Sequence, residues 1–105
     1  MKKSITILSI LGILILTAFS VKQYEKYTTY STISNFLDKT NWSKDTKEII
    51  NEYDIKRGAY YQTITFKDED KNTYEFNVDG NKKVFSYGWD EHGNPLETTE
   101  KYITE

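Results

Sequence analysis

The N-terminal segment constrains the fold of this chain more than any other part. Lys2 and Lys3 are followed by an uncharged, mostly apolar run from Ser4 to Val21. A membrane-spanning helix needs about 17–25 such residues, whereas a secretory signal peptide needs a basic start and an apolar core of about 7–15 residues. Both interpretations place the residues that follow Val21 outside the cytoplasm.

The sequence favours an uncleaved membrane anchor over residues 5–21. The alternative is a secreted protein, because Ala18-Phe19-Ser20 has the small-x-small form of a cleavage site, with the cut between Ser20 and Val21. Ser20 is a weaker final residue than alanine, and the basic start is short. For an anchor, the two N-terminal lysines favour a single pass with the domain of residues 22–105 outside the cell.

The composition of residues 22–105 excludes several classes of protein. These 84 residues suit one small domain, and they carry 12 Lys or Arg and 16 Asp or Glu. A net acidic domain with interspersed charges has no electrostatic footprint for nucleic acid or anionic lipid. The absence of cysteine excludes disulfides and a lipid-attached cysteine.

The core of this domain is expected to be aromatic. Nine Tyr, four Phe and two Trp follow Val21, against six Ile, two Leu and two Val. An aromatic side chain buries about 150–250 Å², so such a core can hold a fold together. Because domains of this size are marginally stable, we expect a partner, a homo-oligomer or the nearby membrane to add to the stability.

Helical spacing continues beyond the apolar run. Apolar residues recur every three or four positions over residues 22–40, which predicts an amphipathic helix that can continue directly from the anchor. The predicted stripe consists of Tyr27, Tyr30, Ile33, Phe36 and Leu37. Residues 41–47 are a predicted break, with Ser43 or Asp45 available as a helix cap.

Alternating residues then predict a sheet. Residues 49–53 suit either a helix or a strand, and we predict a strand over residues 50–57 that ends at Gly58. Clearer strands follow at residues 59–66, 74–78 and 83–89, separated by a polar loop and by an Asp79-Gly80-Asn81 hairpin turn.

The C-terminal tail gives two alternatives. Asn94 and Pro95 suit the cap and first position of a short helix, with Leu96, Thr99 and Ile103 on one side, but the segment could equally fray. The predicted fold is α+β: an N-terminal signal or anchor helix, then one helix packed on a three- or four-stranded antiparallel β-meander.

Part of the sequence resembles a known family. Gly58 to Asp70, Asn72-Thr-Tyr-Glu-Phe76 and the Asp79-Gly80-Asn81 turn followed by Val84 resemble a domain-of-unknown-function family of short Gram-positive proteins. Its members have an N-terminal hydrophobic segment, a helix and a few strands, and the resemblance covers roughly residues 1–89. It implies an extracytoplasmic location and no established activity.

A weaker resemblance is to PepSY-type modules. Those modules place a helix before antiparallel strands with an Asp-Gly-like turn, and they are associated with peptidase regulation at the cell envelope. The helix here departs from them because it lacks their Ala-rich signature.

We expect no catalytic, cofactor or metal site. The only histidine, His92, lies in a Gly/Pro turn, and a Cys–His pair is impossible without cysteine. Asp68, Asp70 and Asn72 are spaced like the first calcium ligands of an EF-hand loop, but Thr73 occupies the position that requires glycine. A solvated hairpin loop is the expected structure there.

Aromatic residues are the best candidates for contact with a partner. Tyr60, Tyr61, Tyr87 and Trp89 lie on predicted strands, and exposed Tyr and Trp side chains are typical interface anchors. The alternative is that they only build the core, although adjacent Tyr60 and Tyr61 point to opposite faces of a strand.

The expected function is a non-enzymatic interaction module at the cell envelope. It would be held in the membrane by residues 5–21 and would contact an envelope protein or peptide, with no nucleic acid. One alternative is a regulator or inhibitor of an envelope peptidase, as the PepSY resemblance implies. Another is a small secreted hydrolase that uses paired carboxylates, for which no constellation stands out.

Overall fold

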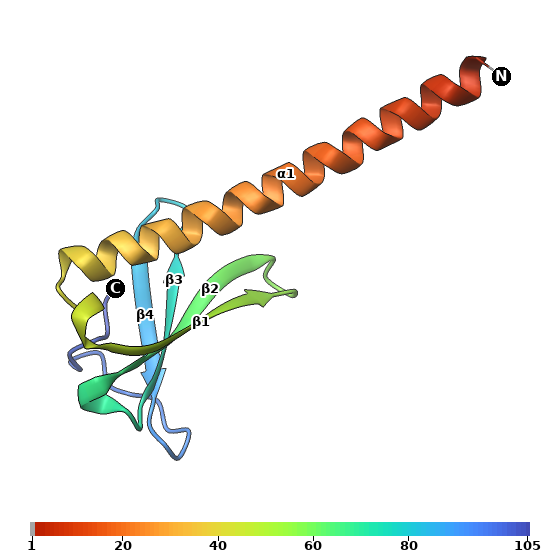
Figure 1. The fold of residues 1–105 in the computed structure, drawn as a ribbon. Helices are drawn as coiled ribbons and strands as arrows, with labels where there is room; N and C mark the ends of the chain where they lie inside the picture. Colours follow the sequence, from red (N-terminus) through yellow and green to blue (C-terminus); the bar gives the residue numbers. More distant parts are fainter. Residues whose placement is uncertain (1) are drawn as a thin grey trace.

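One long helix and one four-stranded sheet make up the fold in the computed structural model (Figure 1). The structure describes the backbone of residues 2–105 and the side chains of residues 9–105. The elements are α1 (Lys2–Lys39), η1 (Ser43–Asp45), β1 (Thr46–Asp54), β2 (Ala59–Phe66), η2 (Lys67–Glu69), β3 (Thr73–Val78) and β4 (Val84–Trp89). Strands lie side by side in chain order and are antiparallel, which confirms the predicted α+β meander.

The two halves of α1 have different surroundings. Its C-terminal half lies across one face of the sheet, and its N-terminal half extends beyond the sheet (Figure 1). The helix is continuous through Val21, where the predicted anchor ends. A single rigid element therefore joins the apolar run to the folded domain.

From Ile10 to Val21, the extended half of α1 exposes apolar side chains on all sides. Half or more of each of the following side chains is exposed: Ile10, Leu11, Ile13, Leu14, Ile15, Leu16, Phe19 and Val21. Among the described residues, no helical stretch is both long enough and apolar enough to cross a membrane. The predicted anchor starts at Ile5, and the side chains of residues 5–8 lie outside the described part.

The half of α1 that packs on the sheet uses a narrower stripe than predicted. Ile33 and Leu37 are buried, and Tyr30 is half-buried. Tyr27 was predicted on the same stripe but is 73 % exposed. At about 100° per residue, six positions displace Tyr27 by roughly 120° around the helix from Ile33, so its ring falls off the packed side.

The break after α1 forms without the predicted caps. Asn41 adopts a left-handed conformation with φ of 65°, which ends the helix as a C-terminal cap residue does. Neither Ser43 nor Asp45 caps a helix, because Trp42 occupies the position before η1 and no side chain caps it. The Trp42 ring instead packs on Phe36 at a centroid distance of 5.5 Å.

β1 begins four residues earlier than predicted. Residues 49–53 form a strand, and the whole of β1 pairs with β2. The strand ends at Asp54 because its carboxylate accepts the backbone N–H groups of Lys56 and Arg57. The N–H of Gly58 then donates to the Asp54 carbonyl at 2.8 Å and closes the turn.

The glycines of the two hairpins have different backbone conformations. Gly58 has a φ of +63°, whereas Gly80 has no positive φ and Lys82 takes the left-handed position of its loop. The Asp79 carboxylate holds that loop by accepting the N–H groups of Asn81 and Lys83. The Asp-Gly signal therefore located the turn but not the residue with positive φ.

We expect Gly58→Ala to lower the free energy of unfolding by about 1 kcal/mol, because alanine is strained at positive φ. Gly80→Ala is the matched control, since a Cβ at position 80 would meet nothing within 4 Å. It should leave stability unchanged or raise it slightly. Urea unfolding of the full chain in detergent micelles measures the stability of both variants. An equal loss of stability in the two would contradict the positive φ assigned to Gly58 alone.

Among the described residues, aromatic side chains supply four of the eight buried apolar positions, so the core is aromatic only in part. The buried apolar residues are Ile33, Leu37, Ile64, Phe66, Tyr74, Phe76, Val84 and Tyr102. Phe66 contacts Tyr74 edge-on at 5.4 Å and stacks on Tyr102 at 3.6 Å. Edge-on ring pairs such as Phe66 and Tyr74 add to the stability that burial alone supplies.

The C-terminal tail neither frays nor forms the predicted helix. Residues 95–105 contain a bridge and turns, and no helix follows Asn94, whose backbone N–H and side-chain amide both donate to the Asp90 carboxylate. The tail is fixed by Tyr102, which is fully buried, and by the Ser86 N–H, which donates to the Thr104 carbonyl at 2.8 Å. Tertiary packing thus outweighs the local helix-start signal at Pro95.

The tail also links stability to pH. The Tyr102 hydroxyl donates to Asp68 at 2.7 Å and, with Lys101, lowers the pKa of that carboxyl. A carboxyl whose pKa is lower in the folded state stabilises the fold above its unfolded pKa of about 3.9 and loses this effect as the pH falls through the folded pKa. We expect the urea midpoint to fall below about pH 4.

The variant Asp68→Asn should flatten this acid dependence. Its midpoint at neutral pH should be lower than that of the unchanged chain, and the two should converge on acidification. Parallel curves for the two proteins would show that the Asp68 contact does not contribute.

Candidate functional site

The face of the sheet turned away from α1 is the strongest candidate site. Residues paired across strands share a face, and Tyr87 pairs with Glu75, which pairs with Thr63. These positions alternate with buried residues such as Ile64 and Tyr74, whose side chains face α1 and the tail. We call the uncovered side the outer sheet face; its large apolar residues are Ile50, Tyr61, Phe85, Tyr87 and Trp89.

Aromatic rings dominate the β4 part of the outer sheet face. The Tyr87 and Trp89 rings meet edge-on with centroids 5.3 Å apart. Tyr87 is 38 % exposed, and Phe85 and Trp89 are half-buried. Rings that are partly exposed and already packed on one another lose little freedom when a partner covers them.

The positively charged Arg57 side chain lies at the β1–β2 part of this face. The Arg57 guanidinium lies 5.5 Å from the centre of the Tyr61 ring and forms an ion pair with Asp54 at 2.6 Å. It also reaches Glu75 at 3.9 Å and the Asn77 side-chain oxygen at 3.4 Å. The hydrogen bond from Arg57 lowers the pKa of the Asp54 carboxyl, so the pair remains charged at neutral pH.

The structure brings together three of the four predicted contact residues. Tyr61, Tyr87 and Trp89 share the outer sheet face. Tyr60 lies on the opposite face, where its ring contacts Tyr30 at 6.0 Å and Tyr53 at 4.6 Å. Tyr60 therefore supports the packing of the β1–β2 hairpin against α1.

Ile50 and Phe85 belong to the face but were not predicted contact residues. Phe85 alternates with Tyr87 and Trp89 along one strand, so the period-two pattern already placed it on the same side. Ile50 carried no such signal, because the choice between helix and strand for its segment was open.

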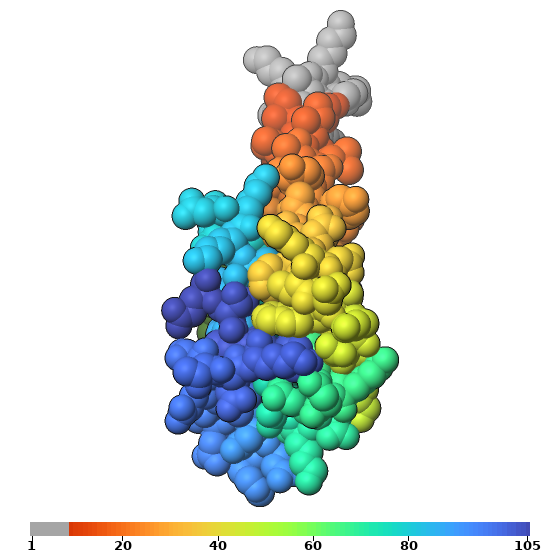
Figure 2. Space-filling model, turned by 90° about the vertical axis from the view of Figure 1, so that its left-hand side faces the viewer, coloured from red at the N-terminus to blue at the C-terminus, as the bar shows by residue number. Residues whose placement is uncertain are grey.

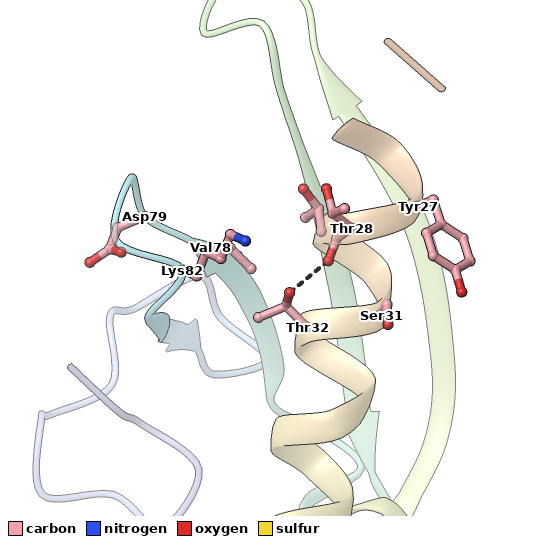
Figure 3. Close-up of a pocket in the computed structure, with 8 residues that line it drawn as sticks. Tyr27, Thr28, Ser31, Thr32, Val78, Asp79 and Lys82 are labelled. Carbon is pink, nitrogen blue, oxygen red and sulfur yellow. Dashed lines mark hydrogen bonds between the residues drawn. The ribbon is translucent and has the colours of Figure 1, made fainter. Parts of the chain in front are cut away.

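A groove between α1 and the β3–β4 loop is a weaker candidate (Figure 3). It has a volume of about 260 Å³, and hydroxyl groups of Thr28, Ser31 and Thr32 line it. The Thr32 hydroxyl donates back to the Thr28 carbonyl, and the Asp79 carboxylate is used by its own loop. The Thr28 and Thr32 hydroxyls and the Asp79 carboxylate are therefore engaged in local structure.

The acidic loop resembling a calcium site is used for structure. Asp68 accepts the Tyr102 hydroxyl, and Asp70 pairs with Lys47 at 3.8 Å. Glu69 accepts the Tyr74 hydroxyl. Within residues 9–105, no three His, Asp or Glu side chains are grouped as metal ligands.

The two edges of the sheet differ. The tail covers β4, because Leu96 donates its N–H to the Gly88 carbonyl at 2.8 Å and Thr104 accepts from Ser86. Among the described residues no further strand pairs with the other side of β1. The β1 edge is therefore available for pairing with an extended peptide.

Comparison with known proteins agrees with the resemblance seen in the sequence. No curated protein and no solved structure matches this chain. Residues 1–76 match the family described as Protein of unknown function (DUF3139), and this match spans the helix, β1, β2 and most of β3. The chain belongs to the DUF3139 family.

Proposed function

We propose that this protein is a membrane-tethered, extracytoplasmic interaction module. The observation that carries the proposal is the extended half of α1, whose apolar side chains are exposed on every side. A helix that is apolar all round needs an apolar environment, and the uncharged run from Ser4 to Val21 is long enough for the hydrocarbon layer. Lys2 and Lys3 favour a cytoplasmic N-terminus, which leaves the sheet outside.

The rigid continuity of α1 supports a tether. A helix that runs unbroken from the apolar segment into the core fixes the domain relative to the bilayer, whereas a flexible linker would let it tumble. A fixed domain presents the same surface to its neighbours, which suits recognition of another envelope protein.

Expression in a Gram-positive host tests the tether. Intact mass of the protein in each cell fraction should give a full-length chain in the membrane. A chain beginning at Val21 in the medium would contradict the anchor and support a released factor.

The outer sheet face is the proposed contact surface. We expect Tyr87→Ala and Trp89→Ala together to reduce crosslinking to the envelope partner at least tenfold, because clustered Tyr and Trp residues commonly carry about 2 kcal/mol or more each. Photo-crosslinking in intact cells measures the yield. Ile49→Ala is the matched control, since Ile49 is similarly exposed but pairs with Ile64 on the other face.

Equal crosslinking by the double variant and the unchanged protein would contradict this surface. Circular dichroism of each variant verifies that the fold is retained. A loss in the Ile49 control alone would place the contact on the other face of the sheet, at β1.

A second candidate function is regulation of an envelope peptidase by strand addition. The open edge of β1 favours it, since an extended peptide can pair there while the tail covers the other edge. The purified full chain should then change the proteolytic rate of an enzyme that co-purifies with it. An unchanged rate at saturating protein would contradict this function.

A further inference from the structure

The β1–β2 hairpin reaches toward the extended half of α1. Figure 1 shows it projecting alongside the helix in the direction of the N-terminus, and Figure 2 shows α1 rising from the domain as a narrow stalk. The Lys22 ammonium lies 5.7 Å from the centre of the Tyr53 ring. The same ammonium would lie 4.0 Å from a Cβ at position 58, so the hairpin turn is level with Lys22.

Lys22 directly follows the apolar run. At 1.5 Å per residue, the hairpin turn is therefore within a few ångströms of the end of that run along the helix axis. The polar headgroup layer on one side of a bilayer is roughly 5–7.5 Å thick, because the bilayer measures about 40–45 Å and its hydrocarbon about 30 Å. With the apolar run in the hydrocarbon, the hairpin turn lies within the headgroup layer.

The residues of the turn suit that layer. Ile55 is 86 % exposed, more than any other large apolar side chain in the described part of the chain. Tyr53 is exposed on the same hairpin, and Tyr24 and Tyr27 are exposed on α1 within six residues of the end of the apolar run; amphipathic aromatic rings concentrate at membrane interfaces.

The charges around the turn are nearly balanced. Glu25 pairs with Lys22 at 3.5 Å, and Asp54 pairs with Arg57. Arg57 is also within 3.9 Å of Glu75, so the charges around the turn balance, but Lys56 in the turn forms no ion pair within residues 9–105. The turn therefore carries both apolar and basic contacts for lipid.

We propose that the β1–β2 hairpin turn is a second membrane contact, in which Ile55 inserts into the headgroup layer and fixes the orientation of the domain on the bilayer. This inference rests on the proposed tether. Lipid is the favoured occupant over a partner protein because the turn is level with the end of the anchor, where the bilayer surface lies. The outer sheet face then points along the membrane toward neighbouring envelope proteins.

The absence of cysteine permits a direct test with single nitroxide labels. Leu14→Cys, Ile50→Cys, Ile55→Cys and His92→Cys place labels in the anchor, on the outer sheet face, at the turn and in an exposed distal loop. Each full-length variant is reconstituted into vesicles of phosphatidylcholine and phosphatidylglycerol. Electron paramagnetic resonance then compares the accessibility of each label to oxygen, which enters lipid, and to a water-soluble nickel complex.

The expected pattern is oxygen access at position 14, intermediate access at position 55, and nickel access at positions 50 and 92. Position 50 is the matched apolar control, because Ile50 is also exposed but lies farther along β1. Full nickel access at 55 with oxygen access at 14 would overturn the turn contact and leave the tether intact. Equal protection at 50 and 55 would also overturn it, and nickel access at 14 would overturn the tether and this inference together.

Discussion

Replacing Tyr102 with alanine is expected to lower the free energy of unfolding by about 3–5 kcal/mol, the range for truncating a large buried aromatic side chain. The Tyr102 ring is fully buried and lies parallel to Phe66 at 3.6 Å. Its edges meet Trp42 at 5.3 Å and Tyr74 at 5.6 Å. Its removal leaves a cavity and also releases the tail from β4.

Urea unfolding of the full chain in micelles, followed by tryptophan fluorescence, measures this loss. Trp42 contacts Tyr102, so its emission reports on the same site. Tyr102→Phe is the control that keeps the ring and removes only the hydroxyl bonded to Asp68. It should cost about 0.5–1.5 kcal/mol, and an alanine variant no less stable than this phenylalanine variant would contradict a packed tail.

Tyrosine ionisation provides an independent check on the same contact. Burial and the Asp68 carboxylate raise the pKa of Tyr102 to about 12. A raised pKa means that the folded state favours the neutral phenol, so this contribution is intact below the ordinary pKa of about 10 and is lost as the pH rises through the folded value.

The importance of Tyr102 could not be predicted from the sequence. Local patterns predict strands well where residues alternate, as in β2 and β3, and they identified Ile33 and Leu37 as the packed side of α1. The tail shows neither the alternation of a strand nor the three-to-four-residue spacing of a helix. The Tyr102 ring and hydroxyl hold it through contacts with Phe66 and Asp68, which are more than thirty positions away. Such contacts form only when the strands have assembled into the sheet, so no local sequence pattern predicts them.

The residues of the outer sheet face could be predicted only in part, because alternation along a strand shows which residues share a face but not which face is covered. Tyr87 and Trp89 are two positions apart on one strand, so they share a face wherever the strand lies. Tyr60 and Tyr61 must point to opposite faces, but only the position of α1 decides which ring is covered. The packing of Tyr30 on Tyr60 decides it, and no local pattern contains that contact.

The second large effect is expected from adding a single methyl group to β4. Gly88 faces the core, where a Cβ would lie 2.8 Å from a Tyr74 ring carbon and 3.0 Å from a Leu96 methyl carbon. The carbonyl oxygen of Thr73 is also 3.0 Å away. Tyr74 cannot move aside cheaply, because it is fully buried and its hydroxyl is bound to Glu69.

Gly88→Ala should therefore lower the free energy of unfolding by about 1–3 kcal/mol, the usual cost of overpacking a core. Gly88 has no positive φ, so the predicted loss of stability comes from tight packing and not from backbone strain. Gly80→Ala serves as the control in open space, and the double variant Gly88→Ala with Leu96→Ala should lose less than the sum of its parts because one of the tight contacts is removed. Additive losses in the double variant would show that Leu96 does not confine position 88.

Equal stability of Gly88→Ala and Gly80→Ala would show that the sheet can open at β4, which would contradict the tight packing of Tyr74 against Gly88.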